Sequence, residues 1–153
     1  MNFRILLMTY LSGIKRKCLM GFLHLKGYKN IDKSSIIEGT VVLDKVNPVG
    51  IHIGKNCLIA GGTSILSHEH IYRNPDNEFI PYMTDTYIGD RCFVGIRAII
   101  LPGVHIGDDC VIGAGCVVNK DIPSGSMAVG VPAKIIRTGI KMSDKATLLG
   151  EYK

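Results

Sequence analysis

Aliphatic residues recur every six positions through most of the chain. The first residue is aliphatic in six successive hexads, which begin at Ile88, Val94, Ile100, Ile106, Ile112 and Val118. Earlier hexads begin at Ile53, Ile59 and Ile65, and weaker ones at Ile31, Ile37 and Leu43. Six residues suit a strand of about three residues and a tight corner, and three such units close a triangular coil of about eighteen residues. We therefore predict an all-β parallel solenoid from Ile31 to about Ile122, with the first hexad positions filling a narrow core.

Small residues at two further hexad positions support this coil. In six hexads Gly or Ala follows the core residue, where we expect the chain to bend sharply: Gly54, Ala60, Gly89, Gly95, Gly107 and Gly113. The fifth position requires a small inward side chain, and four of the five cysteines occupy it: Cys57, Cys92, Cys110 and Cys116. We interpret these cysteines as small buried hydrophobes rather than as catalytic, metal-binding or disulfide-forming residues.

Before the repeat, residues 3–26 show helical spacing. Apolar residues recur there at steps of three and four, and Lys15, Arg16 and Lys17 cluster in the middle. Two interpretations stay open: an amphipathic helix that packs on the solenoid end or on another subunit, or a helix in the plane of a membrane with its basic residues at lipid head groups.

A polar and aromatic stretch over residues 71–87 interrupts the repeat for seventeen residues and contains two prolines. Long loops in compact folds often serve active sites, so we expect a protruding functional loop here. Its polar residues Asn74, Asp76, Glu78 and Asp85 are candidates for binding a substrate.

Composition narrows the range of partners. The 153-residue chain carries a formal charge of +5, which suits an anionic small molecule or anionic lipid. Its basic residues are dispersed and not interleaved with aromatics, which argues against nucleic acid. The odd cysteine count without a CxxC pair, the absence of a secretory signal and the absence of a run long enough to span a bilayer favour a cytoplasmic protein. Residues 3–26 are the candidate for peripheral association with the inner face of the membrane.

Three stretches carry a resemblance to a known family. They are residues 60–70 (AGGTSILSHEH), the uninterrupted repeat from Ile88, and residues 117–123 (VVNKDIP) with residues 130–137 (GVPAKIIR). Together they resemble the hexapeptide-repeat acyltransferases, which fold as left-handed parallel β-helices, and among them the sugar and polysaccharide O-acetyltransferases of the maltose, galactoside and nodulation-factor type. The resemblance covers residues 31–137. We expect a single domain with a helical segment over residues 1–30 and a tail over residues 138–153, which includes a short helix after Ser143.

The resemblance implies acetyl-CoA as co-substrate, no metal, and a homotrimer with sites between subunits. By position it implicates six residues in binding coenzyme A: Gly95, Ile96, Ala114, Asn119, Lys120 and Arg137. The cations near the end of the solenoid suit the phosphates of coenzyme A. The implied reaction is O-acetylation of a sugar hydroxyl, with cell-surface polysaccharide biosynthesis as the expected setting.

Two histidines stand where the repeat breaks. Transfer from a thioester to a hydroxyl requires a general base, and histidine titrates in the neutral range. His68 and His70 end the last regular hexad before the interruption, and two residues apart on a strand they share a face. The catalytic histidine of the family matches His70 best, with His68 second. Glu69, Glu78 and Asp85 are candidates for orienting the base.

Other functions remain open at this point. An N-acetyltransferase acting on an amino sugar, or an antibiotic-acetylating enzyme, would have the same fold. A γ-class carbonic anhydrase would need a third zinc ligand, and here the His-x-His pair has no partner at that family's spacing. A non-enzymatic solenoid would need neither the histidine pair nor the loop.

Overall fold

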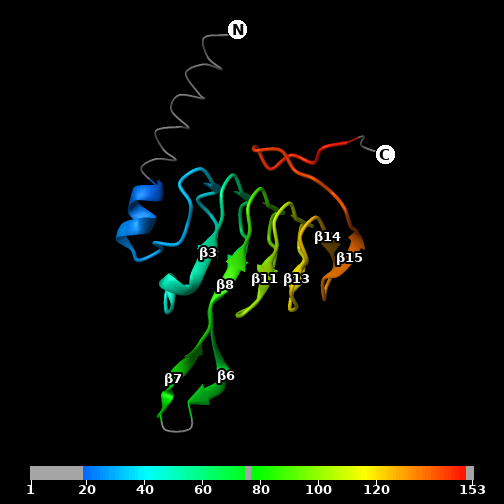
Figure 1. Cartoon of the computed structure of the whole chain (residues 1–153). Coiled ribbons are helices and arrows are strands. Elements are labelled where there is room, and N and C mark those ends of the chain that lie inside the picture. The colour runs from blue at the N-terminus through cyan, green and yellow to red at the C-terminus, as the bar shows by residue number, and fades with distance from the viewer. Residues whose placement is uncertain (1–18, 75–76, 151–153) are drawn as a thin grey trace.

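The computed structural model describes residues 19–74 and 77–150, with residues 72–74 and 77–79 described as backbone only. The chain winds into stacked coils whose short strands line up in three sheets, parallel throughout except for the last strand of the first sheet (Figure 1). The first sheet contains β1 (Ile36–Ile37), β4 (Leu58–Ile59), β9 (Phe93–Val94), β12 (Val111–Ile112), β14 (Met127–Val129) and β15 (Lys134–Arg137). The second contains β2 (Val42–Leu43), β5 (Ser64–Ile65), β10 (Ile99–Ile100) and β13 (Val117–Val118), and the third contains β3 (Ile51–Ile53), β8 (Thr86–Ile88) and β11 (His105–Ile106). This confirms the predicted solenoid.

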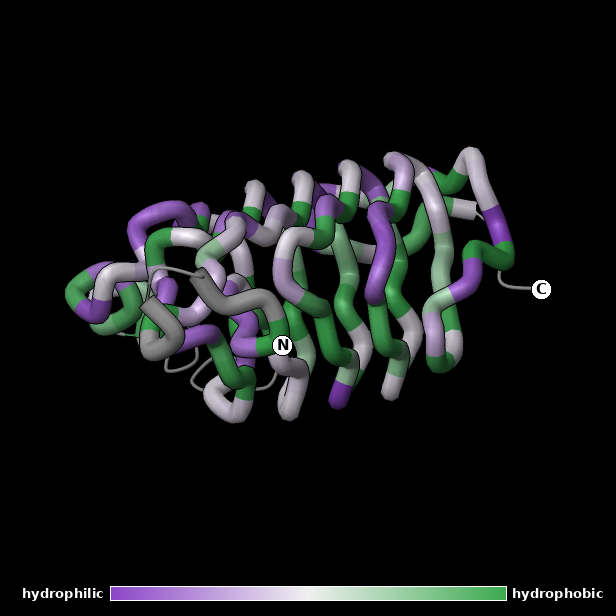
Figure 2. Tube along the Cα trace, turned by 90° about the horizontal axis from the view of Figure 1, so that it is seen from below, coloured by the Kyte–Doolittle hydropathy of each residue, from purple (hydrophilic) through white to green (hydrophobic). Residues whose placement is uncertain are grey.

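The core is a column of one aliphatic side chain per strand. All six first-position residues from Ile88 to Val118 are at most 2% exposed. The fifth-position cysteines Cys57, Cys92, Cys110 and Cys116 are free and buried in the same core, which confirms their structural interpretation. Figure 2 shows hydrophobic positions recurring at the same place in successive coils.

The sharp bends do not lie at the second hexad position, where the sequence predicted them. The fourth hexad position carries the left-handed backbone, at Asn56, Arg91, Arg97 and Asp109 and at glycines elsewhere. The second position instead needs glycine because successive coils nearly touch there. A Cβ on Gly95 would lie 2.6 Å from the backbone nitrogen of Ala114 in the next coil. Tight stacking, rather than turn conformation, therefore explains this part of the repeat.

The interruption is a β-hairpin rather than an irregular loop. Strands β6 (His68–Asn74) and β7 (Asn77–Met83) pair antiparallel and project from the side of the solenoid (Figure 1). Its base is fixed by Asn47, whose side-chain amide donates to the carbonyls of Ser67 (3.0 Å) and Thr84 (3.3 Å). Asn47 lies just before η1 (Pro48–Gly50), the short 3-10 turn formed by the insertion that follows Leu43.

Both ends of the solenoid are covered. A helix over residues 19–25 packs on the first coil, where Met20 and nearby Tyr28 join the core. The rest of the expected helix, residues 3–18, lies outside the described residues. At the other end β15 pairs antiparallel with β14. The short helix expected after Ser143 is wrong, because the chain forms a turn there and Met142 bridges to Leu148.

Neighbouring residues on β10 test the inward and outward faces of the coil. Ile100 is fully buried and Ile99 is 37% exposed. We expect Ile100→Ala to lower the free energy of unfolding by about 2–5 kcal/mol through a cavity in the core. We expect Ile99→Ala to cost less than about 1 kcal/mol. Urea denaturation of both variants measures this, and equal losses would contradict the assigned faces.

Candidate active site

His68 and His70 stand at the base of the hairpin, on its first strand. Both rings lie on the same side, with centroids 5.1 Å apart and planes at 88°. The side chain of His68 is 17% exposed, whereas His70 is exposed. The two predicted histidines are therefore in contact at the point where the regular coil ends and the hairpin begins.

A buried carboxylate that the sequence did not single out contacts this pair. Oδ2 of Asp44, whose side chain is fully buried, meets Nδ1 of His68. The same carboxylate accepts hydrogen bonds from the backbone N–H groups of Ser67 (2.7 Å), Val46 (2.9 Å) and Asn47 (3.3 Å). Burial raises the pKa of Asp44, but these hydrogen bonds outweigh it and hold the pKa below its ordinary value of 3.8.

An ionised Asp44 fixes the tautomer of His68. A carboxylate can only accept, so Nδ1 must carry the proton it donates. The Nε2 atom of a neutral His68 ring is then left with a lone pair. A ring held in this way, at the foot of a protruding hairpin, can take a proton from a hydroxyl group.

Asp44 could have been found from its place in the hexads. It occupies the second position of the hexad that begins at Leu43, where six of the later hexads have Gly or Ala. The pairing of Leu43 with Ile65 places Asp44 beside the start of the hairpin, one coil away. A polar residue at a position reserved for small residues, one coil before the break, was the available signal.

The other expected carboxylates lie elsewhere. Asp85 faces the third sheet, with its Oδ2 atom 3.1 Å from both Nε2 of His52 and the hydroxyl of Tyr87. The hydrogen bond from Tyr87 to Asp85 raises the pKa of that phenol. Asp76 lies outside the described residues, as do the side chains of Asn74 and Glu78. Glu69 pairs with Tyr82 across the hairpin backbone.

The residues expected to bind coenzyme A fall on three different edges of the solenoid. Gly95, Ile96 and Ala114 come together at stacked corners between the first and second sheets, where the N–H of Gly115 donates to the carbonyl of Ile96 (2.8 Å). Asn119 and Lys120 are exposed at the corner that follows β13, on the same edge as the histidine pair. Arg137 pairs with Met127, at the opposite end of the first sheet's strands from Lys134.

Comparisons with known proteins agree with this arrangement. Residues 34–67 and 86–120 match the family described as "Hexapeptide repeat of succinyl-transferase". The matched ranges stop at the hairpin and resume after it. Over 140 residues the chain is 34% identical to "Putative acetyltransferase YvoF" of Bacillus subtilis, covering 90% of this chain and 74% of that protein. The chain belongs to the hexapeptide-repeat acetyltransferases.

Two further comparisons place this hexapeptide-repeat acetyltransferase near sugar-modifying members. It is 36% identical over 113 residues to the galactoside O-acetyltransferase of Escherichia coli, covering 71% of this chain and 53% of that one. A solved galactoside acetyltransferase in complex with coenzyme A superposes with a TM-score of 0.57 at 30% identity, covering 69% and 62% of the two chains. The chain thus spans about half the length of the galactoside enzyme it matches. The fold is the left-handed β-helix of this family, and the protein is an acyltransferase.

The described residues contain neither a cluster of metal ligands nor a membrane-spanning helix. No three His, Cys, Asp or Glu side chains in that part of the chain gather closely enough to hold a metal ion. No helix among the same residues is long and apolar enough to cross a membrane.

The lowered pKa of Asp44 gives a pH-dependent prediction. A depressed pKa in the folded state stabilises the protein above the ordinary value, and this contribution is lost as the pH falls through the folded value. We expect Asp44→Asn to lower the free energy of unfolding by about 1–3 kcal/mol near neutrality. The deficit should shrink below about pH 4. Urea denaturation across this range tests it, with the exposed Asp144→Asn as control. A constant deficit at every pH would contradict an ionised Asp44.

Proposed function

We propose that this enzyme transfers the acetyl group of acetyl-CoA to a hydroxyl of a sugar, with His68 as general base, in the biosynthesis of a cell-surface polysaccharide. The observation that carries the chemistry is the contact between His68 and the buried Asp44. Sugar acceptors are favoured by the galactoside O-acetyltransferase among its relatives. The hairpin that interrupts the repeat begins at the histidine pair, and we expect it to contact the sugar.

The proposed order of the two histidines reverses the sequence-based preference. His70 was expected as base with His68 as its neighbour. The buried, hydrogen-bonded carboxylate supports His68, since it sets the tautomer and stabilises the imidazolium that forms during reaction. His70, exposed beside it with the rings edge to face, is placed to contact the incoming acceptor.

The reaction proceeds by direct transfer. Nε2 of His68 takes the proton of the acceptor hydroxyl as its oxygen attacks the thioester carbonyl carbon. The carbonyl oxygen gains the electron pair and is stabilised by a backbone N–H of a coil edge. The carbon–sulfur bond then breaks, and the departing thiolate of coenzyme A takes the proton from the imidazolium.

In a trimer with sites between subunits, the expected coenzyme A residues can meet although they lie on different edges of one subunit. The edge with Gly95, Ile96 and Ala114 and the edge with the histidines and Lys120 flank the sheet β13-β10-β5-β2, a full side of the coil apart. If one edge of one subunit meets the other edge of its neighbour, both sets line a single groove. Arg137, on the outermost strand of the first sheet, would then make a separate contact with coenzyme A.

Single variants of the two histidines test the proposed base. We expect His68→Ala to lower kcat for transfer from acetyl-CoA to a sugar acceptor by about 10²–10⁴-fold, with a small change in KM. We expect His70→Ala to act mainly on the KM of the acceptor. Acceptor panels analysed by mass spectrometry provide the readout. A severe loss in His70→Ala with normal turnover in His68→Ala would restore the sequence-based order, and acetylation of amines alone would point to an N-acetyltransferase.

Lys120 tests the placement of the coenzyme. We expect Lys120→Ala to raise the KM of acetyl-CoA by roughly tenfold, the effect of losing one charge-assisted contact to a phosphate, with kcat nearly unchanged. Lys141→Ala, an exposed lysine in the tail, should leave both constants unchanged. Identical kinetics in the two variants would remove Lys120 from the site.

A further inference from the structure

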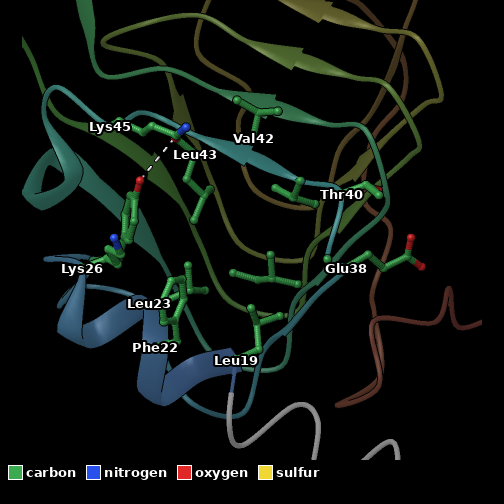
Figure 3. Close-up of a pocket in the computed structure, with 13 residues that line it drawn as sticks. Leu19, Phe22, Leu23, Lys26, Glu38, Thr40, Val42, Leu43 and Lys45 are labelled. Carbon is green, nitrogen blue, oxygen red and sulfur yellow. Dashed lines mark hydrogen bonds between the residues drawn. The ribbon is translucent and has the colours of Figure 1, made fainter.

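A groove lies between the helix over residues 19–25 and the first coil of the solenoid, with a volume of about 730 Å³ (Figure 3). Helix residues form one wall, and the segment from Ile37 to Lys45 forms the other. The side chains that line the groove do not include Asp44 or the two histidines of the proposed acetyl-transfer site. The groove therefore needs an explanation of its own.

The middle of the groove is apolar and open. Leu19, Leu23 and Leu43 line it, together with Phe22 and Val42, which are 54% and 52% exposed. No described element covers these two side chains. A linear aliphatic chain laid in the groove would remove their surface from water, at roughly 25 cal/mol per Å² of apolar area buried.

One end of the groove is cationic. Lys26 and Lys45 both line the groove on the side away from Glu38 (Figure 3). In the described part of the chain no carboxylate lies within 4.0 Å of either ammonium group, and Lys26 rests over the ring of Phe22 at 5.4 Å. The carboxylate of Glu38 has another partner, since it accepts a hydrogen bond from the backbone N–H of Gly61 at 2.6 Å. The groove thus combines an apolar trough with an uncompensated positive end.

The cationic end of the groove and the histidine pair are linked through one short stretch of the chain. Leu43 and Lys45 line the groove, and Asp44 between them turns the other way to contact His68. A head group held at Lys45 would therefore be bound by the residue that directly follows Asp44, the partner of His68.

We infer that the groove binds the aliphatic anchor of a phosphate-bearing amphiphile, with its phosphate at Lys26 and Lys45 and its sugar directed toward His68. The acceptor would then be a lipid-phosphate-linked sugar. The acceptor role rests on the proposed function, whereas binding of the anchor does not.

Calorimetric titration of the full chain with dodecyl phosphate, below its critical micelle concentration and without acetyl-CoA, tests the binding. We expect dodecyl phosphate to bind, dodecyl maltoside with the same chain and a neutral head to bind about tenfold more weakly, and inorganic phosphate to show no measurable binding. Equal affinity for the two amphiphiles would overturn the charged-head assignment. No binding of dodecyl phosphate would overturn the proposal and leave the groove to residues 1–18 or to a second copy of the chain.

Matched variants locate the binding. Lys26→Gln/Lys45→Gln should weaken dodecyl phosphate about tenfold or more and leave dodecyl maltoside unchanged. Phe22→Ser should weaken both amphiphiles, whereas Val49→Ser, at the same 54% exposure but outside the groove, should weaken neither. Equal effects of Phe22→Ser and Val49→Ser would overturn the proposed location. Binding without any acetyl transfer to sugars would retain the groove and refute the proposed function, and transfer without binding would do the reverse.

Discussion

Close stacking of successive coils is the constraint on which the rest of this structure depends. Each coil must bring its backbone against the coil before it, so that every strand finds a hydrogen-bonding partner and every core side chain lies over its equivalent. The contact between Gly95 and Ala114 shows how little space remains. Under that constraint each position of the hexad has one location in the coil. A segment that breaks the sequence pattern therefore also leaves the regular solenoid.

The proposed catalytic pair follows from the same register. Because Leu43 pairs with Ile65, the residue after Leu43 faces the segment that leads into the hairpin. Asp44 there accepts the backbone N–H of Ser67, which leads into the hairpin, and those of Val46 and Asn47 in the insertion that follows it, and it also contacts His68. One buried carboxylate thus stabilises the exit of the hairpin and orients His68, the base that we propose.

Much of the fold could be predicted because its signal is periodic. The core residues from Ile53 to Val118, the buried cysteines and the site of the interruption all followed from spacing. The hairpin pairing within residues 68–83 could not, because that segment contains prolines and no alternation strong enough to identify strands. The bend was assigned to the second hexad position, whereas residues such as Asn56 and Arg91 at the fourth position adopt the left-handed backbone. The repeat shows which hexad positions hold small residues. It does not show whether such a position needs a small residue for its backbone conformation or for close contact with the next coil.

The site was predictable only in part. His68 and His70 were found because they stand at a break in the pattern. The choice of His68 over His70 as the proposed base depended on a contact between coils. Asp44 lies twenty-four residues from His68 in sequence, and only the paired strands reveal that they meet. The most direct measurement of the central claim is the tautomer of His68, read from long-range ¹H–¹⁵N correlations of its ring. The account predicts a neutral ring protonated at Nδ1, and a mixture of tautomers once Asp44 is replaced by Asn. A neutral His68 protonated at Nε2 in the native protein would contradict it.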